Sequence, residues 1–269
     1  MRSFSARPSP SSSPQQTSAD GQRLAKRVAE LMACSRRDAE LYVEGGFVSV
    51  DGVMVDRPQF RVLKQQIAIA PHAKPEESQP VTLLLHRPPG FEADDADMPS
   101  LQRGAKFAIE LLVLPSRFAG DRATERPLRR HFAQQLCVTA LETGASGLLV
   151  FTQDFRIKRK LQEDAARVEH EVIVDVTGEV TPEALEWLNR APVIDGRAML
   201  PAKVSVSRQD EKTTGLRFAV KGCYPGQIAQ MCSNVNLRVI GMKRLRIGRL
   251  PLAGLPAGQW RYLLPYERF

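Results

Sequence analysis

Cysteine is scarce in this sequence, and long apolar runs are absent. The 269 residues include four cysteines, none of them in a C-x-x-C pair. That spacing argues against a disulfide scaffold and against a structural zinc site, and it favours a reducing, cytoplasmic compartment. The longest apolar stretches, such as residues 81–85 and 147–151, are the size of a strand, so the sequence predicts no membrane-spanning segment.

Other functional signals are missing as well. Residues 1–21 have no apolar stretch like that of a secretory signal and are rich in Ser, Pro and Gln, so we expect a disordered tail. Residues 92–97 carry four carboxylates without an ordered pattern of oxygen ligands, and we expect no metal site. No Ser or Cys nucleophile lies in a recognisable motif, so His86, His131 and His170 are expected to be structural. We expect no cofactor.

Positive charge is what the sequence has in excess. The formal net charge is +8 and the pI is about 9.6, which favours a polyanionic partner. Between Lys212 and Tyr266 the chain has no Asp or Glu. The basic residues of this stretch are Lys212, Arg217, Lys221, Arg238, Lys243, Arg244, Arg246, Arg249 and Arg261. Either they bind phosphates or they form a solvated face.

Residues 22–70 have the pattern of a small helix-helix-hairpin module. Apolar residues at helical spacing predict a first helix from Leu24, and Ser35 is placed to cap a second one that ends at the glycine pair 45–46. Asp51-Gly52 is a strong signal for a two-residue hairpin. Basic side chains near the two helix starts are expected to bind RNA phosphates: Arg23, Lys26, Arg27, Arg36 and Arg37.

This module resembles the alpha-L RNA-binding motif of a ribosomal small-subunit protein and of several RNA enzymes. The resemblance is carried by residues 23–26, 34–39, 43–46 and 48–52. It implies that RNA is the partner.

Residues 71–80 are rich in proline and poor in apolar residues, so they are expected to link this module to a second domain, residues 81–269. The patterns predict strands over 81–85, 146–152, 168–176, 202–208, 216–220 and 237–247, with helices over 155–162, 181–190 and 227–232. Asp154 and Thr181 are the expected caps of the first two helices. The predicted fold class is α+β with a mainly antiparallel mixed sheet.

The second domain resembles the catalytic domain of bacterial ribosomal-RNA pseudouridine synthases, in the branch that carries an alpha-L module ahead of it. Four landmarks occur in the order of that family: residues 85–90, residues 147–152, residues 200–204, and residues 227–231 followed by 243–248. The resemblance implies binding of ribosomal RNA by a monomer. Lys203, Lys243, Arg244 and Arg246 are the phosphate-binding candidates in this domain.

Departures from the family pattern fall on the residues that carry its chemistry. The signature R-L-D-x-x-T-x-G-L-L, aligned on its Gly-Leu-Leu, places Ala140 at the arginine, Glu142 at the nucleophilic aspartate and Ala145 at the threonine. Val172 stands where the family has a tyrosine that packs on the flipped base. The basic helix start of the family corresponds to residues 222–231, which lack its arginines.

These departures favour an RNA-binding protein whose catalysis is impaired or lost. A carboxylate misplaced by ~1 Å loses roughly a hundredfold in rate, and a missing aromatic ring forfeits about 1–3 kcal/mol of stacking. One alternative is an active divergent synthase, with Glu142 as nucleophile and Arg129, Arg130 or a later basic residue in place of the lost arginine. The other is a scaffold that binds an acidic protein.

Overall fold

The computed structural model describes residues 21–77, 79–93, 106–190, 193–194, 197–222 and 224–269. The expected tail, apart from Gly21, and the aspartates of the acidic loop lie outside these residues. The chain divides into two compact units, one up to Gln79 together with Arg126–Ala133, the other Pro80–Glu125 with Gln134–Phe269. Within the described residues, no helix is long and apolar enough to cross a membrane.

The first unit has the predicted helix-helix-hairpin order. Its elements are β1 (Gln22–Arg23), α1 (Leu24–Met32), α2 (Arg36–Glu44), β2 (Val48–Val50), β3 (Val53–Met54), β4 (Arg61–Val62) and β5 (Ile67–Ile69). Ser35 caps α2, because its hydroxyl accepts a hydrogen bond from Asp38 N at 3.1 Å. Asp51 and Gly52 both have positive φ, 50° and 80°, as the turn between β2 and β3 requires. These predictions are confirmed.

The first unit also contains a segment that the sequence did not assign to it. Residues 126–133 come from the weakly patterned middle of the chain and form the 3₁₀ turn η3 (Arg129–Phe132). Leu128 is 6% exposed, and Arg129 N donates to an Asp56 carboxylate oxygen at 2.7 Å. A Cβ on Gly46 would lie 2.7 Å from a Leu128 methyl carbon, so glycine lets this segment pack closely.

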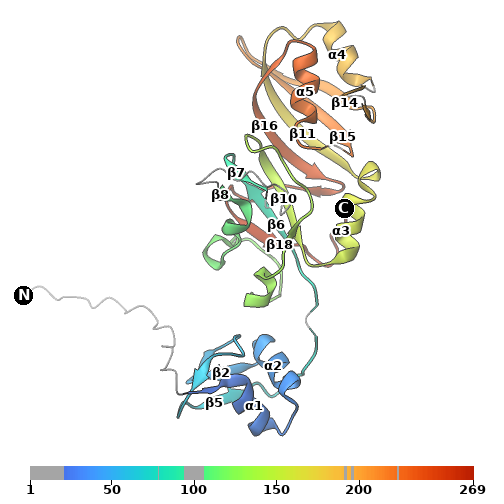
Figure 1. Cartoon of the computed structure of the whole chain (residues 1–269). Helices are drawn as coiled ribbons and strands as arrows, with labels where there is room; N and C mark the ends of the chain where they lie inside the picture. Colours follow the sequence, from blue (N-terminus) through green and yellow to red (C-terminus); the bar gives the residue numbers. More distant parts are fainter. Residues whose placement is uncertain (1–20, 78, 94–105, 191–192, 195–196, 223) are drawn as a thin grey trace, which may run out of the picture. The chain divides into compact units, whose positions relative to one another are not determined.

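The second unit is built around one large sheet (Figure 1). Its strands are β6 (Thr82–Arg87), β7 (Phe91–Glu92), β8 (Lys106–Phe107), β9 (Leu136–Cys137), β10 (Ser146–Thr152), β11 (Glu169–Thr177), β12 (Val193–Ile194), β13 (Arg197–Ala198), β14 (Lys203–Gln209), β15 (Thr214–Lys221), β16 (Arg238–Ile247), β17 (Leu250–Pro251) and β18 (Trp260–Tyr262). Its helices are α3 (Phe155–Gln162), α4 (Pro182–Asn189) and α5 (Gln227–Asn234), with 3₁₀ turns η1 (Ala108–Leu111), η2 (Leu114–Ser116) and η4 (Ala165–Arg167).

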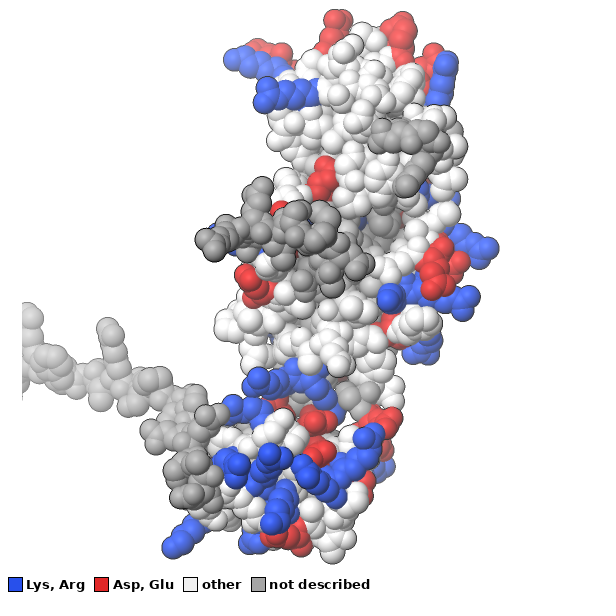
Figure 2. All heavy atoms as spheres, in the orientation of Figure 1, with Lys and Arg blue, Asp and Glu red and all other residues white. Residues whose placement is uncertain are grey.

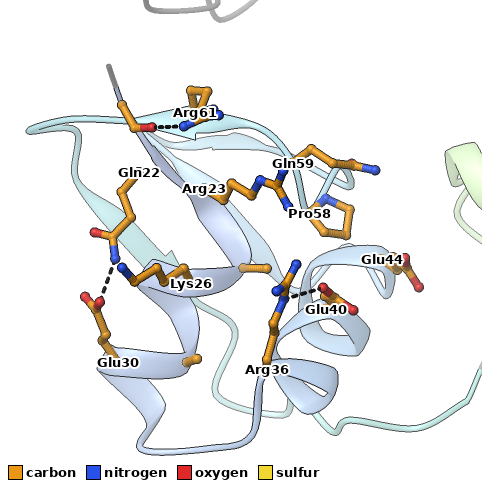
Figure 3. Close-up of a pocket in the computed structure, with 13 residues that line it drawn as sticks. Gln22, Arg23, Lys26, Glu30, Arg36, Glu40, Glu44, Pro58, Gln59 and Arg61 are labelled. Carbon is orange, nitrogen blue, oxygen red and sulfur yellow. Dashed lines mark hydrogen bonds and ion pairs between the residues drawn. The ribbon is translucent and has the colours of Figure 1, made fainter. Parts of the chain in front are cut away.

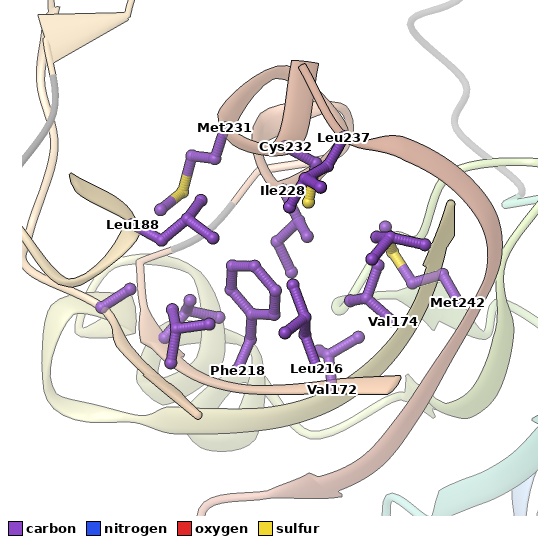
Figure 4. Packing of buried hydrophobic residues seen from close by; sticks show 14 of the residues in the cluster. Val172, Val174, Leu188, Leu216, Phe218, Ile228, Met231, Cys232, Leu237 and Met242 are labelled. Carbon is purple, nitrogen blue, oxygen red and sulfur yellow. The ribbon is translucent and has the colours of Figure 1, made fainter. Parts of the chain in front are cut away.

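The main path of the sheet runs β14-β15-β11-β16-β10-β6-β18. Neighbours along it are antiparallel except β10 and β16, which are parallel. The helices α4 and α5 pack on one face, where Leu188, Ile228 and Met231 meet Phe218 and Val174 of the strands (Figure 4). The predicted α+β class with a mainly antiparallel mixed sheet is confirmed. Asp154 and Thr181 cap α3 and α4, as predicted.

Candidate functional site

The loop that precedes β10 carries Glu142, and two buried arginines hold its backbone. Arg87, at the end of β6, is 0% exposed, and Arg244 of β16 is 3% exposed. Arg87 forms no ion pair within the described part of the chain. Both guanidinium groups donate to carbonyl oxygens, and charge-assisted hydrogen bonds of this kind are stronger than neutral ones.

Arg87 reaches the Glu142 loop from one side. Its Nη1 donates to Phe91 O at 2.7 Å and to Leu141 O at 3.2 Å, and its Nη2 donates to Ala145 O at 2.6 Å and to Glu142 O. Burial lowers the pKa of Arg87 from its ordinary value. No role was predicted for this arginine, although a charged residue that ends a mostly apolar strand is a signal for a buried polar partner.

Arg244 holds the same loop through bonds to other carbonyls. Its Nε donates to Leu148 O at 2.8 Å, its Nη1 to Ala140 O at 3.3 Å, and its Nη2 to Thr139 O. The prediction that Arg244 binds RNA phosphate is therefore wrong, because its side chain is buried and donates to the protein's own backbone. Gly147 has to be glycine here, since a Cβ would lie 2.3 Å from Arg244 O.

The Glu142 carboxylate points to the start of α5. Its Oε1 accepts a hydrogen bond from Gly226 N, the N-cap of that helix, at 2.8 Å. None of the described Lys or Arg side chains forms an ion pair with it. Glu142 lines a cavity of about 20 Å³. The other lining residues are Ala140, Leu141, His170, Val172, Val220, Tyr224, Pro225, Ile228, Met242 and Arg244.

The wall of this cavity opposite the loop comes from β11. Val172, at the position of the family's tyrosine, is 3% exposed. Burial, together with the nearby Arg244 and Arg246 cations, lowers the pKa of His170 to about 3. His170 is therefore neutral near pH 7 and supplies no positive charge to a carboxylate. Tyr224 and Pro225, which precede α5, complete the wall, and the sequence predicted neither.

Three of the five predicted basic residues of the first unit line a groove of about 920 Å³ (Figure 3). Arg23, Lys26 and Arg36 line it, whereas Arg27 and Arg37 lie outside its lining. Arg61 of β4 lines it as well and was not predicted; its Nη1 donates to Gly21 O at 2.5 Å. The only signal in the sequence for Arg61 is that it is one more basic residue in the same module.

Several of these cations have acidic partners on the surface. Arg36 pairs with Glu40 at 3.1 Å, Arg27 with Glu30 at 3.2 Å, and Arg37 with Glu77 at 2.7 Å. Exposed pairs of this kind contribute about 0–1 kcal/mol, so they exchange readily for a phosphate. Arg23 and Lys26 are exposed and form no ion pair within the residues that the structure describes.

The basic stretch after Lys212 does not form one open cationic surface. Arg246 pairs with Glu169 at 2.8 Å and with Glu171 at 3.0 Å, and Arg217 pairs with Glu171 at 3.5 Å. Arg246 and Arg217 of the predicted basic stretch are therefore paired with carboxylates of β11. Lys203 and Lys243, also predicted to bind RNA, are exposed.

Comparisons with known proteins point to RNA modification. Residues 22–67 match the S4 domain. The chain is 26% identical over 249 residues to ribosomal large subunit pseudouridine synthase B of Bacillus subtilis, covering 91% of this chain and 93% of that one. It is 24% identical over 245 residues to the dual-specificity RNA pseudouridine synthase RluF of Escherichia coli K12, covering 91% and 76%.

A chloroplast relative and a solved structure agree with these matches. The putative ribosomal large subunit pseudouridine synthase SVR1 of Arabidopsis thaliana is 27% identical over 239 residues; the match covers 86% of this chain and 56% of that protein's length. A crystal structure of a pseudouridylate synthase superposes with a TM-score of 0.54 at 18% identity, covering 90% and 96%. The chain has an S4 domain and the fold of a pseudouridylate synthase.

Proposed function

We propose that this chain, an S4-domain homologue of the ribosomal large-subunit pseudouridine synthases, binds structured ribosomal RNA with its capacity to isomerise uridine impaired or lost. It acts as a monomer and needs no cofactor. The first half of the proposal rests on the S4 domain and on the basic groove around Arg23, Lys26 and Arg36. The second half rests on the surroundings of Glu142.

The observation that carries the loss of catalysis is the small volume of the cavity beside Glu142, whose side chain is only partly buried. A cavity of about 20 Å³ is close to the minimum needed for a single water molecule. A nucleotide flipped out of its helix needs a pocket that encloses the whole base. The Gly226 N–H also holds one carboxylate oxygen of Glu142 toward the start of α5.

Among the described residues, no Lys or Arg forms an ion pair with Glu142 that would supply the replacement cation of an active divergent enzyme. Arg129 and Arg130 belong to the first unit, where Glu44 and Asp56 are the charged neighbours of Arg130. Arg244 lines the cavity, but its three nitrogen atoms donate to backbone carbonyls. A carboxylate nucleophile without a bidentate partner loses the group that would fix its orientation.

Ribosomal RNA from cells with and without the gene tests the catalytic half directly. Pseudouridine is chemically labelled and mapped at every uridine, with complementation by the wild-type chain and by Glu142→Gln. We expect identical maps in all four samples. A pseudouridine that disappears with the gene and returns with the wild type but not with Glu142→Gln would establish the active divergent synthase instead.

A gain-of-function variant sharpens the same test. Ala140→Arg, Glu142→Asp and Val172→Tyr together restore the family's arginine, nucleophile and aromatic ring. Because Val172 is buried beside a cavity of about 20 Å³, we expect the triple variant to remain inactive unless the wall formed by Tyr224 and Pro225 is also opened. Measurable isomerisation by the wild type alone, on purified ribosomal RNA, would contradict the proposal.

A further inference from the structure

A second basic groove lies in the second unit, at the opposite end of β10 from Glu142. We call it the α3 groove, and its volume is about 810 Å³, within the range of about 300–1,000 Å³ typical of ligand sites. It is lined by Phe155, Arg156, Arg159, Lys160, Asp164, Arg167, Val168, Glu169, Lys221, Gly248, Arg249 and Phe269. The groove shares no lining residue with the Glu142 cavity, although Glu169 and Lys221 are next in sequence to His170 and Val220 of that cavity.

Backbone hydrogen bonds bring three parts of the chain together in the walls of the α3 groove. Gly222 N donates to Ala165 O at 3.1 Å, which places Lys221 at the end of β15 next to η4 and Arg167. Gly248 N donates to Glu169 O at 2.7 Å, which fixes the turn that carries Arg249. The groove is thus built on ordered segments.

The charge of the α3 groove is strongly positive. Six of its lining side chains are Lys or Arg, against the carboxylates of Asp164 and Glu169. Glu169 is already paired with Arg246 at 2.8 Å. Arg156 and Arg159 have partners in Asp154 and Glu163.

Four cations remain without a carboxylate partner. Lys160, Arg167, Lys221 and Arg249 are exposed, and none forms an ion pair within the described ranges of the chain. Uncompensated cations gathered at one groove favour a polyanion, because each one releases counterions from a bound phosphate.

Phe155 gives the groove a feature that a simple anion site lacks. It is the first residue of α3, it is 65% exposed, and it lines the groove beside the cations. The Asp154 carboxylate accepts a hydrogen bond from Arg156 N at 2.8 Å, so the start of the helix is fixed. An exposed aromatic ring held beside phosphate-binding cations is the arrangement that stacks an unpaired base.

We propose that the α3 groove binds an unpaired segment of the RNA that this protein recognises, with phosphates on Lys160, Arg167, Lys221 and Arg249 and one base stacked on Phe155. The inference rests on the proposed binding of ribosomal RNA and adds a second contact, made by residues other than those that line the S4 groove or the Glu142 cavity. An acidic protein segment would satisfy the cations but would not need the exposed ring.

Binding of a fluorescent ribosomal RNA fragment with a single-stranded loop, measured with the full chain over a series of KCl concentrations, tests this contact. Lys160→Gln with Arg249→Gln should reduce the magnitude of the log–log salt slope by roughly 1.5. Phe155→Ala should weaken binding by roughly 5- to 150-fold with the slope unchanged, and Phe155→Tyr should restore it. The matched controls are Lys212→Gln with Arg122→Gln, exposed cations outside the groove, and Leu114→Ala, an apolar side chain that is 59% exposed.

The outcomes separate this inference from the function on which it rests. If the wild type shows no salt-dependent RNA binding, the proposed function fails. A second outcome is that the wild type binds RNA, Lys26→Gln with Arg36→Gln weakens that binding, and the α3 variants bind like their controls. In that case the proposed RNA contact at the α3 groove is overturned, and the proposed binding of ribosomal RNA stands. If the α3 variants bind RNA like the wild type but no longer bind an acidic protein, the proposal that this groove binds RNA is overturned as well.

Discussion

At the scale of single residues, this protein keeps buried arginines at the Glu142 loop but uses them for the backbone. Arg87 and Arg244 together donate to carbonyls on both sides of Glu142. They hold the shape of the loop without pairing with its carboxylate. The two arginines therefore fix the backbone of the loop and leave the Glu142 carboxylate to other partners.

Replacing Arg87 with Met should destabilise the second unit by about 1.5–3 kcal/mol. The change removes four hydrogen bonds from a charged donor, but three are part-buried and their carbonyls can bind water instead, so the expected loss is that of the one buried bond, to Ala145 O, about 1.5–3 kcal/mol. Urea unfolding measures the loss. Arg249→Met is the control, since this exposed arginine forms no ion pair with the described residues and should change stability by less than about 0.5 kcal/mol. Equal effects of the two substitutions would rule out the structural role of Arg87.

His170 should make the stability of the second unit fall below neutral pH. Its pKa is about 3 in the folded chain and about 6.5 when unfolded, so between these values only the unfolded chain binds the proton. Stability is thus retained above pH ~6.5 and lost as the pH falls, by about 1.4 kcal/mol at pH ~5.5. The free energy of unfolding of the wild type and of His170→Gln, measured above pH ~6.5 and at pH ~5.5, checks this. Parallel pH dependence of the two proteins would contradict it.

At the scale of elements, the sequence predicted helices and long strands because their signals are local. The caps at Ser35, Asp154 and Thr181 each act within three residues. The η3 segment carried no such signal. Its place depends on Leu128 packing against Gly46, a contact between residues far apart in the chain.

Leu128→Ala should therefore destabilise the first unit, although Leu128 lies far from it in sequence. Truncating a buried leucine costs about 2–5 kcal/mol, and Leu128 is 6% exposed. Amide hydrogen exchange in α2 and β2 reports the loss, because these elements belong to the first unit. Leu63→Ala is the control, since that side chain is 56% exposed. Unchanged protection of α2 in Leu128→Ala would show that residues 126–133 do not stabilise this unit.

At the scale of the whole molecule, the net charge says less about phosphate binding than the ion pairs of the individual cations do. Figure 2 shows Lys and Arg side chains gathered over the first unit. In the second unit, by contrast, Arg217 and Arg246 are matched by carboxylates of β11. The positive charge of the sequence is therefore divided between cations free to bind phosphate and cations already satisfied.

The salt dependence of RNA binding should follow this division. Lys26→Gln with Arg36→Gln removes two cations of the S4 groove and should lower the magnitude of the log–log salt slope by roughly 1.5. Arg217→Gln with Arg246→Gln should change the slope less, because Arg246 is 30% exposed and pairs with two carboxylates, whereas Arg36 has a single exposed partner in Glu40. Fluorescence anisotropy with a ribosomal RNA fragment measures both. A larger change from the second pair would refute this division of charge.

The sequence by itself determined the S4 module, the α+β class and the position of Glu142 before β10, because caps, turns and ordered motifs are local properties. It could not determine which arginines are buried, since Arg87 and Arg244 reach their carbonyl partners across strands that are distant in the chain. Nor could it determine the size of the cavity at Glu142, which depends on how β11, α5 and β16 pack together. Tertiary structure alone decided these features, because burial and pairing arise only when distant segments meet.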